Sequence, residues 1–373
     1  MSIPARPFRA DHVGSLLRPG ALKEAREKAR RGSIDPDELR AAEDDAIRDV
    51  VALQEAAGLS AITDGELRRT MWHTDFLTGL DGIEATRADY AINFKGEGGE
   101  TKATASMMEV TGKVRRSRAL MIDHFRFLKS VTGRTAKFCV PSPTFLHMRG
   151  GRSIVNEEVY PDMDEFWADI VQAFREEIRD LVEAGCTYLQ IDDVSFATLC
   201  DTDVRQQIRR DGEDPERLAM LYSSIVDDIV TDLDKTLSVT MHTCRGNFQS
   251  LWMASGGYEA VAEIMLNRIG VDGFFLEFDT DRAGGFEPLR FAPRNKKIVL
   301  GLVSSKVPRL ETRDELKRRI DEASKYVPLE NLCLSPQCGF ASSHHGNRVD
   351  EDIVKRKLEL VVSVATDIWG TAQ

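Results

Sequence analysis

The sequence has no long apolar segment. None of its hydrophobic runs reaches the roughly 18 residues that a membrane-spanning helix needs, and residues 1–6 lack the apolar core of a secretory signal. We therefore expect a cytoplasmic protein that does not act at a membrane.

The sequence also lacks an excess of positive charge. Its 50 lysine and arginine residues are outnumbered by 61 aspartate and glutamate residues, so the formal net charge is −11. Nucleic acids and anionic membranes are themselves negative, so this balance argues against either as the main partner. We expect a small-molecule partner, and the sequence leaves homo-oligomerisation open.

Cysteine is too sparse for a disulfide framework. The chain has six cysteines in 373 residues, and in a reducing compartment the thiols of Cys244 and Cys338 would be free to bind metal. We interpret the other four as buried or incidental: Cys139, Cys186, Cys200 and Cys333.

Internal repeats, coiled-coil heptads and low-complexity segments are absent as well, which argues against a scaffold protein.

Strand-like and helix-like segments alternate along the whole chain. About eight apolar strand candidates end near residues 14–15, 64–66, 141–143, 192–193, 242–244, 277, 304–306 and 337–339. Amphipathic helices are predicted over residues 37–57, 163–185, 214–234, 311–325 and 350–367. This pattern predicts one α/β domain over residues 1–373 with the (β/α)8 TIM-barrel fold. The sequence pattern of residues 84–116 predicts an inserted β-hairpin, which would cover the site as a lid.

Four residues at the ends of predicted strands are candidate metal ligands: His242, Cys244, Glu277 and Cys338. His242 and Cys244 are two residues apart in a β-branched run, so their side chains point to the same side of a strand. Imidazole, thiolate and carboxylate groups all bind zinc, and one weak ligand suits a catalytic ion that must admit a substrate. Core packing is the competing interpretation of the histidine and the cysteines.

Other polar residues also follow predicted strands, where TIM barrels carry their active sites. Of Asp192 and Asp193, one could bind a substrate amine and the other could orient a metal ligand or a loop. The alternative is that they cap the next helix. Residues 11–15 suit the capture of a carboxylate by backbone N–H groups, and residues 63–66 add carboxylates. Ordinary turn chemistry is the alternative for both segments.

Three basic residues follow the last predicted strands. Lys306 would point at the mouth of the barrel, where it is a candidate proton donor. His344 and His345 follow Cys338 on one loop, and are either solvent-facing turn residues or part of the site.

Seven short motifs carry a family resemblance: Asp11-His12-Val13-Gly14-Ser15-Leu16-Leu17-Arg18-Pro19, Asp64-Gly65-Glu66, Gln190-Ile191-Asp192-Asp193, His242-Thr243-Cys244, Leu276-Glu277, Gly301-Leu302-Val303-Ser304-Ser305-Lys306 and Pro336-Gln337-Cys338-Gly339. On these residues the chain resembles the catalytic barrel of cobalamin-independent methionine synthase, and more closely its short single-barrel relatives, over nearly its whole length. The resemblance implies one zinc ion bound by His242, Cys244, Glu277 and Cys338.

The resemblance also implies a substrate. Val13, Gly14 and Ser15 would receive the carboxylate of homocysteine, while Glu66 and Asp192 would hold its amino group. Zinc would keep the substrate sulfur as a thiolate, which attacks a methyl group. The implied activity is a zinc-dependent S-methyl transfer that gives methionine.

Two departures leave the methyl donor open between 5-methyltetrahydrofolate and another methylated compound. Lys306 stands where the long enzymes of the family carry a catalytic histidine, and would act as an acid or as a fixed charge. Residues 143–148 contain no tryptophan, where the long enzymes place one against the pterin.

Two alternative functions remain. A zinc-dependent thiol alkyltransferase of the epoxyalkane:coenzyme M transferase kind would not need an amino-acid clamp, so the presence of both Glu66 and Asp192 favours an amino-acid thiol. A non-catalytic zinc-binding barrel would have a closed four-ligand site.

Overall fold

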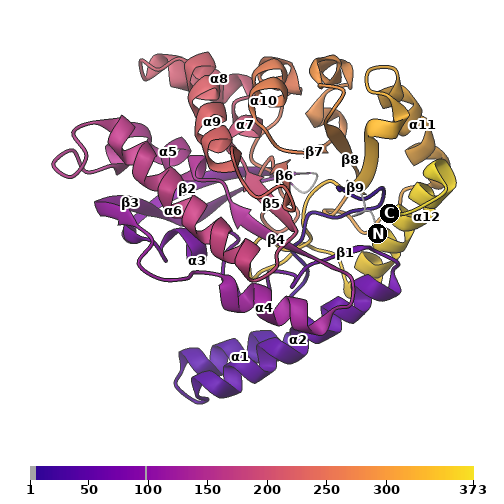
Figure 1. The fold of residues 1–373 in the computed structure, drawn as a ribbon, viewed down its shortest axis with the longest axis horizontal. Helices are drawn as coiled ribbons and strands as arrows, with labels where there is room; N and C mark the ends of the chain where they lie inside the picture. Colours follow the sequence, from indigo (N-terminus) through magenta and orange to yellow (C-terminus); the bar gives the residue numbers. More distant parts are fainter. Residues whose placement is uncertain (1–5, 97–98) are drawn as a thin grey trace.

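The computed structural model describes residues 6–96 and 99–373. Within these residues, seven parallel strands form one curved sheet in the order β1, β4, β5, β6, β7, β8, β9, with helices around its outer side (Figure 1). The strands are β1 (Ala61–Ile62), β4 (Thr135–Pro141), β5 (Tyr188–Asp193), β6 (Ser238–Thr243), β7 (Gly273–Glu277), β8 (Lys297–Val303) and β9 (Leu332–Pro336). The α/β TIM-barrel prediction is confirmed.

The five helices predicted from the sequence begin within a few residues of the predicted positions, because local side chains cap them. The described α-helices are α1 (Gly20–Arg30), α2 (Pro36–Ala56), α3 (Thr74–Leu77), α4 (Ile122–Val131), α5 (Thr144–Gly150), α6 (Met163–Glu183), α7 (Ser195–Thr198), α8 (Thr202–Arg210), α9 (Pro215–Val230), α10 (Ala262–Arg268), α11 (Arg313–Ser324) and α12 (Glu351–Trp369). Capping boxes start α2, through Asp35 and Glu38, and α11, through Thr312 and Glu315.

The prediction of a first strand that ends at Gly14 and Ser15 is wrong. Residues 9–14 lie between β9 and β1, but they pair with β9 only through a bridge between Ala10 and Leu334. The Asp11 carboxylate accepts the N–H of His12 (2.7 Å), and Gly14 has a φ of +134°. Both features turn the backbone out of the strand conformation, so the barrel closes here through irregular chain.

Side chains alternate between the helices and the barrel interior. On β5, Leu189 and Ile191 pack in the large core beneath the helices, whereas Tyr188 and Gln190 are the intervening residues. The interior holds its own small apolar cluster, formed by Val13, Phe275, Val299 and Cys333. This period of two means that the inward residues at the strand ends face one common space.

A hairpin follows β1 and α3. Strands β2 (Asp81–Gly96) and β3 (Gly99–Arg115) pair antiparallel, and Figure 1 shows them beside α5 and α6. Lys95 and Trp252 exchange two backbone hydrogen bonds, of 2.7 and 2.8 Å. The hairpin is therefore joined to the loop that follows β6.

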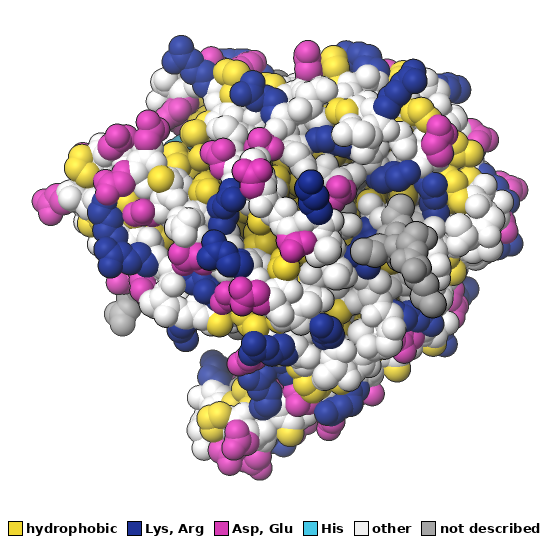
Figure 2. Space-filling model, in the orientation of Figure 1, with side chains coloured by type: hydrophobic (Ala, Val, Ile, Leu, Met, Phe, Trp, Pro, Cys, Tyr) yellow, Lys and Arg dark blue, Asp and Glu magenta, His cyan; other side chains and the backbone are white. Residues whose placement is uncertain are grey.

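Charges of both signs are interspersed over the face drawn in Figure 2. In the described part of the chain, no helix is long and apolar enough to cross a membrane.

Glu177 of α6 ties down the chain that leaves the hairpin. Its buried carboxylate accepts hydrogen bonds from Arg116 Nε (2.6 Å), Leu120 N (3.0 Å) and Met121 N (2.7 Å). This one side chain fixes the connection from β3 to α4, and with it the base of the hairpin.

Replacing Glu177 with alanine should lower the free energy of unfolding by roughly 3 kcal/mol, because the Arg116 guanidinium and two backbone N–H groups lose their partner. Urea unfolding followed by circular dichroism measures the loss. Glu183→Ala, at an exposed position of the same helix, is the matched control and should change stability by less than about 0.5 kcal/mol. Equal losses in the two variants would contradict an anchoring role for Glu177.

Candidate functional site

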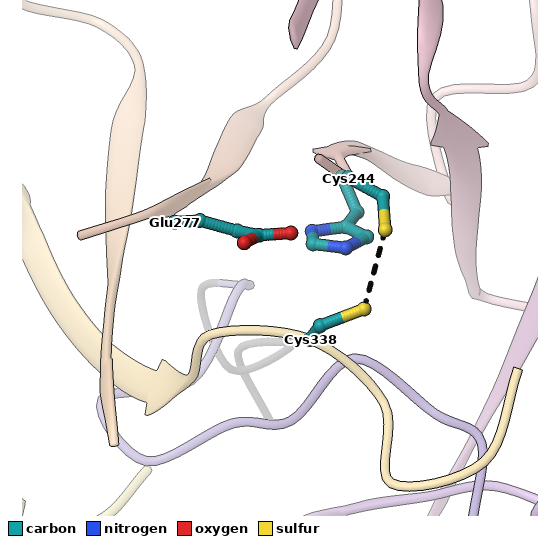
Figure 3. A group of neighbouring side chains, drawn as sticks. Cys244, Glu277 and Cys338 are labelled. Carbon is teal, nitrogen blue, oxygen red and sulfur yellow. Dashed lines mark hydrogen bonds between the residues drawn. The ribbon is translucent and has the colours of Figure 1, made fainter. Parts of the chain in front are cut away.

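Four side chains meet at the carboxyl ends of β6, β7 and β9. The ligand atoms of His242, Cys244, Glu277 and Cys338 all lie within 4.8 Å of one another. The two sulfur atoms are 3.3 Å apart. In Figure 3 the carboxylate of Glu277 approaches from the side opposite these sulfurs.

One ring nitrogen in this cluster lacks a partner. The Nδ1 of His242 lies 3.3 Å from the carbonyl oxygen of Phe275, whereas its buried Nε2 makes no hydrogen bond to any described residue. A buried polar atom without a partner is costly, and a metal ion would satisfy it. The carbonyl contact on Nδ1 is also the usual arrangement for a histidine that ligates through Nε2. The donor set therefore fits zinc.

The two thiols differ in their protonation. The hydrogen bond from Cys244 lowers the pKa of Cys338 well below its usual range, and nearby His242 adds to this effect against the opposing effect of burial. The same contact, together with burial, raises the pKa of Cys244. The contact therefore favours the thiolate form of Cys338, which is the form that binds metal.

The Glu277 carboxylate is held by its surroundings. It accepts hydrogen bonds from Arg245 N (2.8 Å), Gln337 Nε2 (2.9 Å) and Arg282 Nη2 (3.0 Å). Burial acts to raise the pKa of Glu277, but the charges of Arg282 and Lys306 outweigh it and lower the pKa. The carboxylate is therefore ionised and fixed in direction.

A second acidic cluster lies beside the first. Atoms of Glu66, Cys139 and Asp192 lie within 4.8 Å of one another. Burial is the main cause that raises the pKa of Glu66 to about 8 and that of Asp192 to about 6. Glu66 Oε2 is buried without a partner among the described residues, and Glu66 has a strained φ of +57°. This pair is suited to a cationic ligand.

Asp192 and its neighbour Asp193 have different roles. Asp192 Oδ1 accepts a hydrogen bond from Gln190 Nε2 (2.7 Å) and lines the pocket. Asp193 accepts from Phe196 N (2.9 Å) and Thr144 Oγ1 (2.7 Å). Both residues line the pocket, but the Asp193 carboxylate is held by the start of the following helix, whereas that of Asp192 is held only from its own strand.

Residues 13–15 offer free backbone donors. In the described part of the chain, no hydrogen bond is donated by the N–H groups of Val13, Gly14 or Ser15, although Val13 and Ser15 are buried. Buried N–H groups are rarely left without a partner. Three consecutive ones suit an anion.

One pocket joins these groups. Its lining includes residues of the three groups described above: Val13, Ser15, Glu66, Asp192, Asp193, His242, Cys244 and Cys338. Its lining also includes apolar side chains from the hairpin, from α5 and from nearby loops: Trp72, Ile92, Phe94, Met107, Met108, Phe145 and Phe248. The pocket can therefore hold a polar and an apolar molecule next to each other.

The structure places the three basic candidates differently. Lys306 is buried, and its Nζ lies 3.0 Å from Asn247 Oδ1 and 3.5 Å from the carbonyl oxygen of Gly246; Gly246 and Asn247 line the pocket. His344 and His345 are exposed. Lys306 is thus next to the site, while the two histidines face solvent.

The chain matches the model of a known protein family over nearly its whole length. The family described as "Cobalamin-independent synthase, Catalytic domain" matches residues 8–367. The chain belongs to the cobalamin-independent methionine synthase family.

Two relatives and one solved structure illustrate the membership of this family. The uncharacterized protein YxjH of Bacillus subtilis (strain 168) is 44% identical over 365 residues, which cover 97% of this chain and 95% of that protein. A protein named methionine synthase from Sulfurisphaera tokodaii is 24% identical, over 88% of this chain and 84% of its own length. The crystal structure of a putative vitamin-B12 independent methionine synthase from Listeria monocytogenes is 36% identical, with a TM-score of 0.79, and covers 99% of this chain and 100% of that one.

Sequence reasoning missed several residues of this family member's site. Gln337 and Arg282, which hold Glu277, lie next to Cys338 and five residues after Glu277, but no local pattern marks their direction. Trp72 and Phe145 form an edge-to-face pair with ring centroids 5.2 Å apart. Residues 143–148 thus meet a tryptophan from another segment, which only the fold brings there.

Glu66→Gln should remove a pH-dependent loss of stability. The folded protein keeps the Glu66 proton up to about pH 8, whereas an unperturbed glutamate loses it near pH 4.5. Between these values the folded state binds more protons than the unfolded state, so stability falls as the pH rises. The free energy of unfolding of the variant, relative to wild type, should rise by on the order of 4 kcal/mol across this window.

Urea unfolding of the metal-free proteins at about pH 4.5 and about pH 8 measures this difference. Glu183→Gln, at an exposed position, should follow wild type. A Glu66→Gln profile that stays parallel to wild type would show that Glu66 is ionised in the folded protein throughout the range.

Proposed function

We propose that this protein is a zinc-dependent S-methyltransferase that methylates homocysteine to methionine. The observation that carries the proposal is that one pocket is lined both by the acidic pair and by three residues of the four-ligand cluster, His242, Cys244 and Cys338. Such a pocket suits an amino acid whose thiol lies at a metal and whose ammonium lies at two carboxylates. Membership of the methionine synthase family supports the same activity.

The clamp residues would bind both charged ends of homocysteine. Glu66 and Asp192 would pair with the ammonium group, which favours their ionised forms despite burial. The free N–H groups of Val13, Gly14 and Ser15 would donate to the carboxylate. These contacts would direct the thiol of the substrate toward the ligand cluster.

His242, Cys244, Glu277 and Cys338 would hold the zinc ion. When bound, zinc would supply positive charge that favours the thiolate form of the substrate sulfur at neutral pH. Arg282 and Gln337 keep Glu277 in place during the reaction.

The apolar lining of the pocket would receive the methyl donor, 5-methyltetrahydrofolate or another methylated compound. A new bond forms between the thiolate sulfur and the methyl carbon, and the bond from that carbon to the donor breaks. Its electron pair stays on the donor. Lys306, held by Asn247, would stabilise the resulting negative charge or deliver a proton to it.

Two buried carboxylates weigh against the thiol of coenzyme M as the acceptor, because its sulfonate would meet Glu66 and Asp192 in a desolvated site. The access of the pocket to Cys244 and Cys338 weighs against a closed, non-catalytic zinc site.

The purified protein should contain about one zinc ion per chain, and Cys338→Ser should lose most of it. Elemental analysis of the two proteins tests this. Cys333→Ser is the matched control, since Cys333 is buried on β9, the strand that Cys338 follows, but is outside the ligand cluster. Equal zinc content in the two variants would show that the ligand set is wrong.

Wild type supplied with homocysteine and a panel of methyl donors should form methionine. Lys306→Met should slow single-turnover transfer by about 10²-fold, the usual scale for one acid–base group, while zinc content and homocysteine binding stay close to wild type. Lys317→Met, on the exposed side of α11, is the control. Faster alkylation of coenzyme M than of homocysteine would favour the alternative thiol alkyltransferase, and an unchanged rate would remove Lys306 from the mechanism.

A further inference from the structure

The carbonyl groups that precede the three free N–H groups are each held by a side chain from elsewhere in the fold. The three hydrogen bonds are Lys137 Nζ to His12 O (2.5 Å), Gln190 Nε2 to Val13 O (2.6 Å) and Thr63 Oγ1 to Gly14 O (2.6 Å). Their donors come from β4, from β5 and from the chain after β1. Three elements therefore determine the orientation of three consecutive peptide planes.

This anchoring controls where the N–H groups point. In a planar trans peptide, the carbonyl oxygen and the following N–H lie on opposite sides. A carbonyl that is turned toward Lys137 therefore turns the N–H of Val13 away from it, and the same holds for the N–H groups of Gly14 and Ser15. Val13 and Ser15 line the pocket, and the N–H groups of all three residues are free for a ligand.

Lys137 is the strongest of these anchors because it is charged and cannot move away. Its side chain is fully buried, and its Nζ also lies 3.0 Å from Asp11 Oδ1. Asp11 in turn accepts the hydroxyl of Tyr188 at 2.7 Å, and the ammonium lies 4.1 Å from the ring centroid of Phe275. A cation bonded to a carbonyl also polarises the peptide, which makes the attached N–H a better donor.

We propose that Lys137, with Thr63 as a second anchor, is a positioning residue that sets the specificity of the thiol site for substrates carrying a carboxylate. The inference rests on the proposed function. Lys137 does not touch the substrate. It acts by aiming the N–H groups of residues 13–15 at the substrate carboxylate. In the described part of the chain its Nζ bonds Asp11 and the carbonyl of His12, not Glu66 or Asp192, and its charge is only a minor influence on the pKa of Asp192, which burial dominates.

Three thiol probes separate the two ends of the substrate. Homocysteine has both charged groups, 4-mercaptobutanoate lacks the amine, and 3-mercaptopropylamine lacks the carboxylate. Each probe is titrated calorimetrically into the zinc-loaded protein. Lys137→Met should weaken the binding of homocysteine and of 4-mercaptobutanoate, the two probes that carry a carboxylate, by about tenfold or more. The affinity for 3-mercaptopropylamine should stay within about twofold of wild type, because its contacts to Glu66 and Asp192 remain.

Thr63→Val is the second variant, since it keeps the shape of the side chain and leaves the pair of Lys137 and Asp11 intact. It should show the same selective loss if Lys137→Met does not fold. Thr198→Val removes the hydroxyl of another buried threonine, which bonds only the carbonyl of Val194, and should leave all three affinities unchanged.

An equal loss for all three thiols in both anchor variants would overturn the inference, because it would reveal a merely structural role. Wild-type protein that transfers methyl groups to homocysteine but binds 3-mercaptopropylamine equally well would overturn it while leaving the proposed function standing. Zinc-loaded wild type that binds none of the thiols would overturn both.

Discussion

The site depends on the parallel register of the barrel strands. Asp192 on β5 lies opposite His242 on β6, and His242 lies opposite Phe275, two residues before Glu277. Neighbouring strands are about 4.8 Å apart, so inward side chains at matching levels form one cluster. A shift by one residue would turn them all toward the helices. His242, Cys244 and Cys338 therefore line the same pocket as Glu66 and Asp192.

This arrangement concentrates charge where water is scarce. Burial raises the pKa of Glu66 and Asp192, and Glu66 also has a strained backbone. A folded protein keeps such groups only when surrounding contacts hold them, as Gln190 does for Asp192 and as Arg282 and Gln337 do for Glu277. A ligand of opposite charge would offset the cost, so binding and stability are linked.

The hairpin supplies part of the apolar lining of the pocket. Its apolar side chains Phe94 and Met108 line the same pocket as the charged groups Glu66 and Asp192. The backbone bridge from Lys95 to Trp252 joins the hairpin to the loop after His242 and Cys244. The hairpin is therefore held by its backbone to the segment that carries two residues of the candidate ligand cluster.

The sequence alone determined the fold class, the starts of the five long helices that it predicted and the residues at most strand ends, because these depend on local periodicity, capping and short motifs. Local pattern alone did not distinguish Asp192 from Asp193, which only the family resemblance separated, and the sequence predicted a regular first strand where Asp11 and Gly14 turn the chain. Only the tertiary structure gave the two aspartates their different hydrogen-bond partners and brought Lys137 to His12, 125 residues away in the chain. Such contacts depend on how distant strands align and on which buried charges need a partner. No local sequence pattern predicts the strand alignment or the charge pairing.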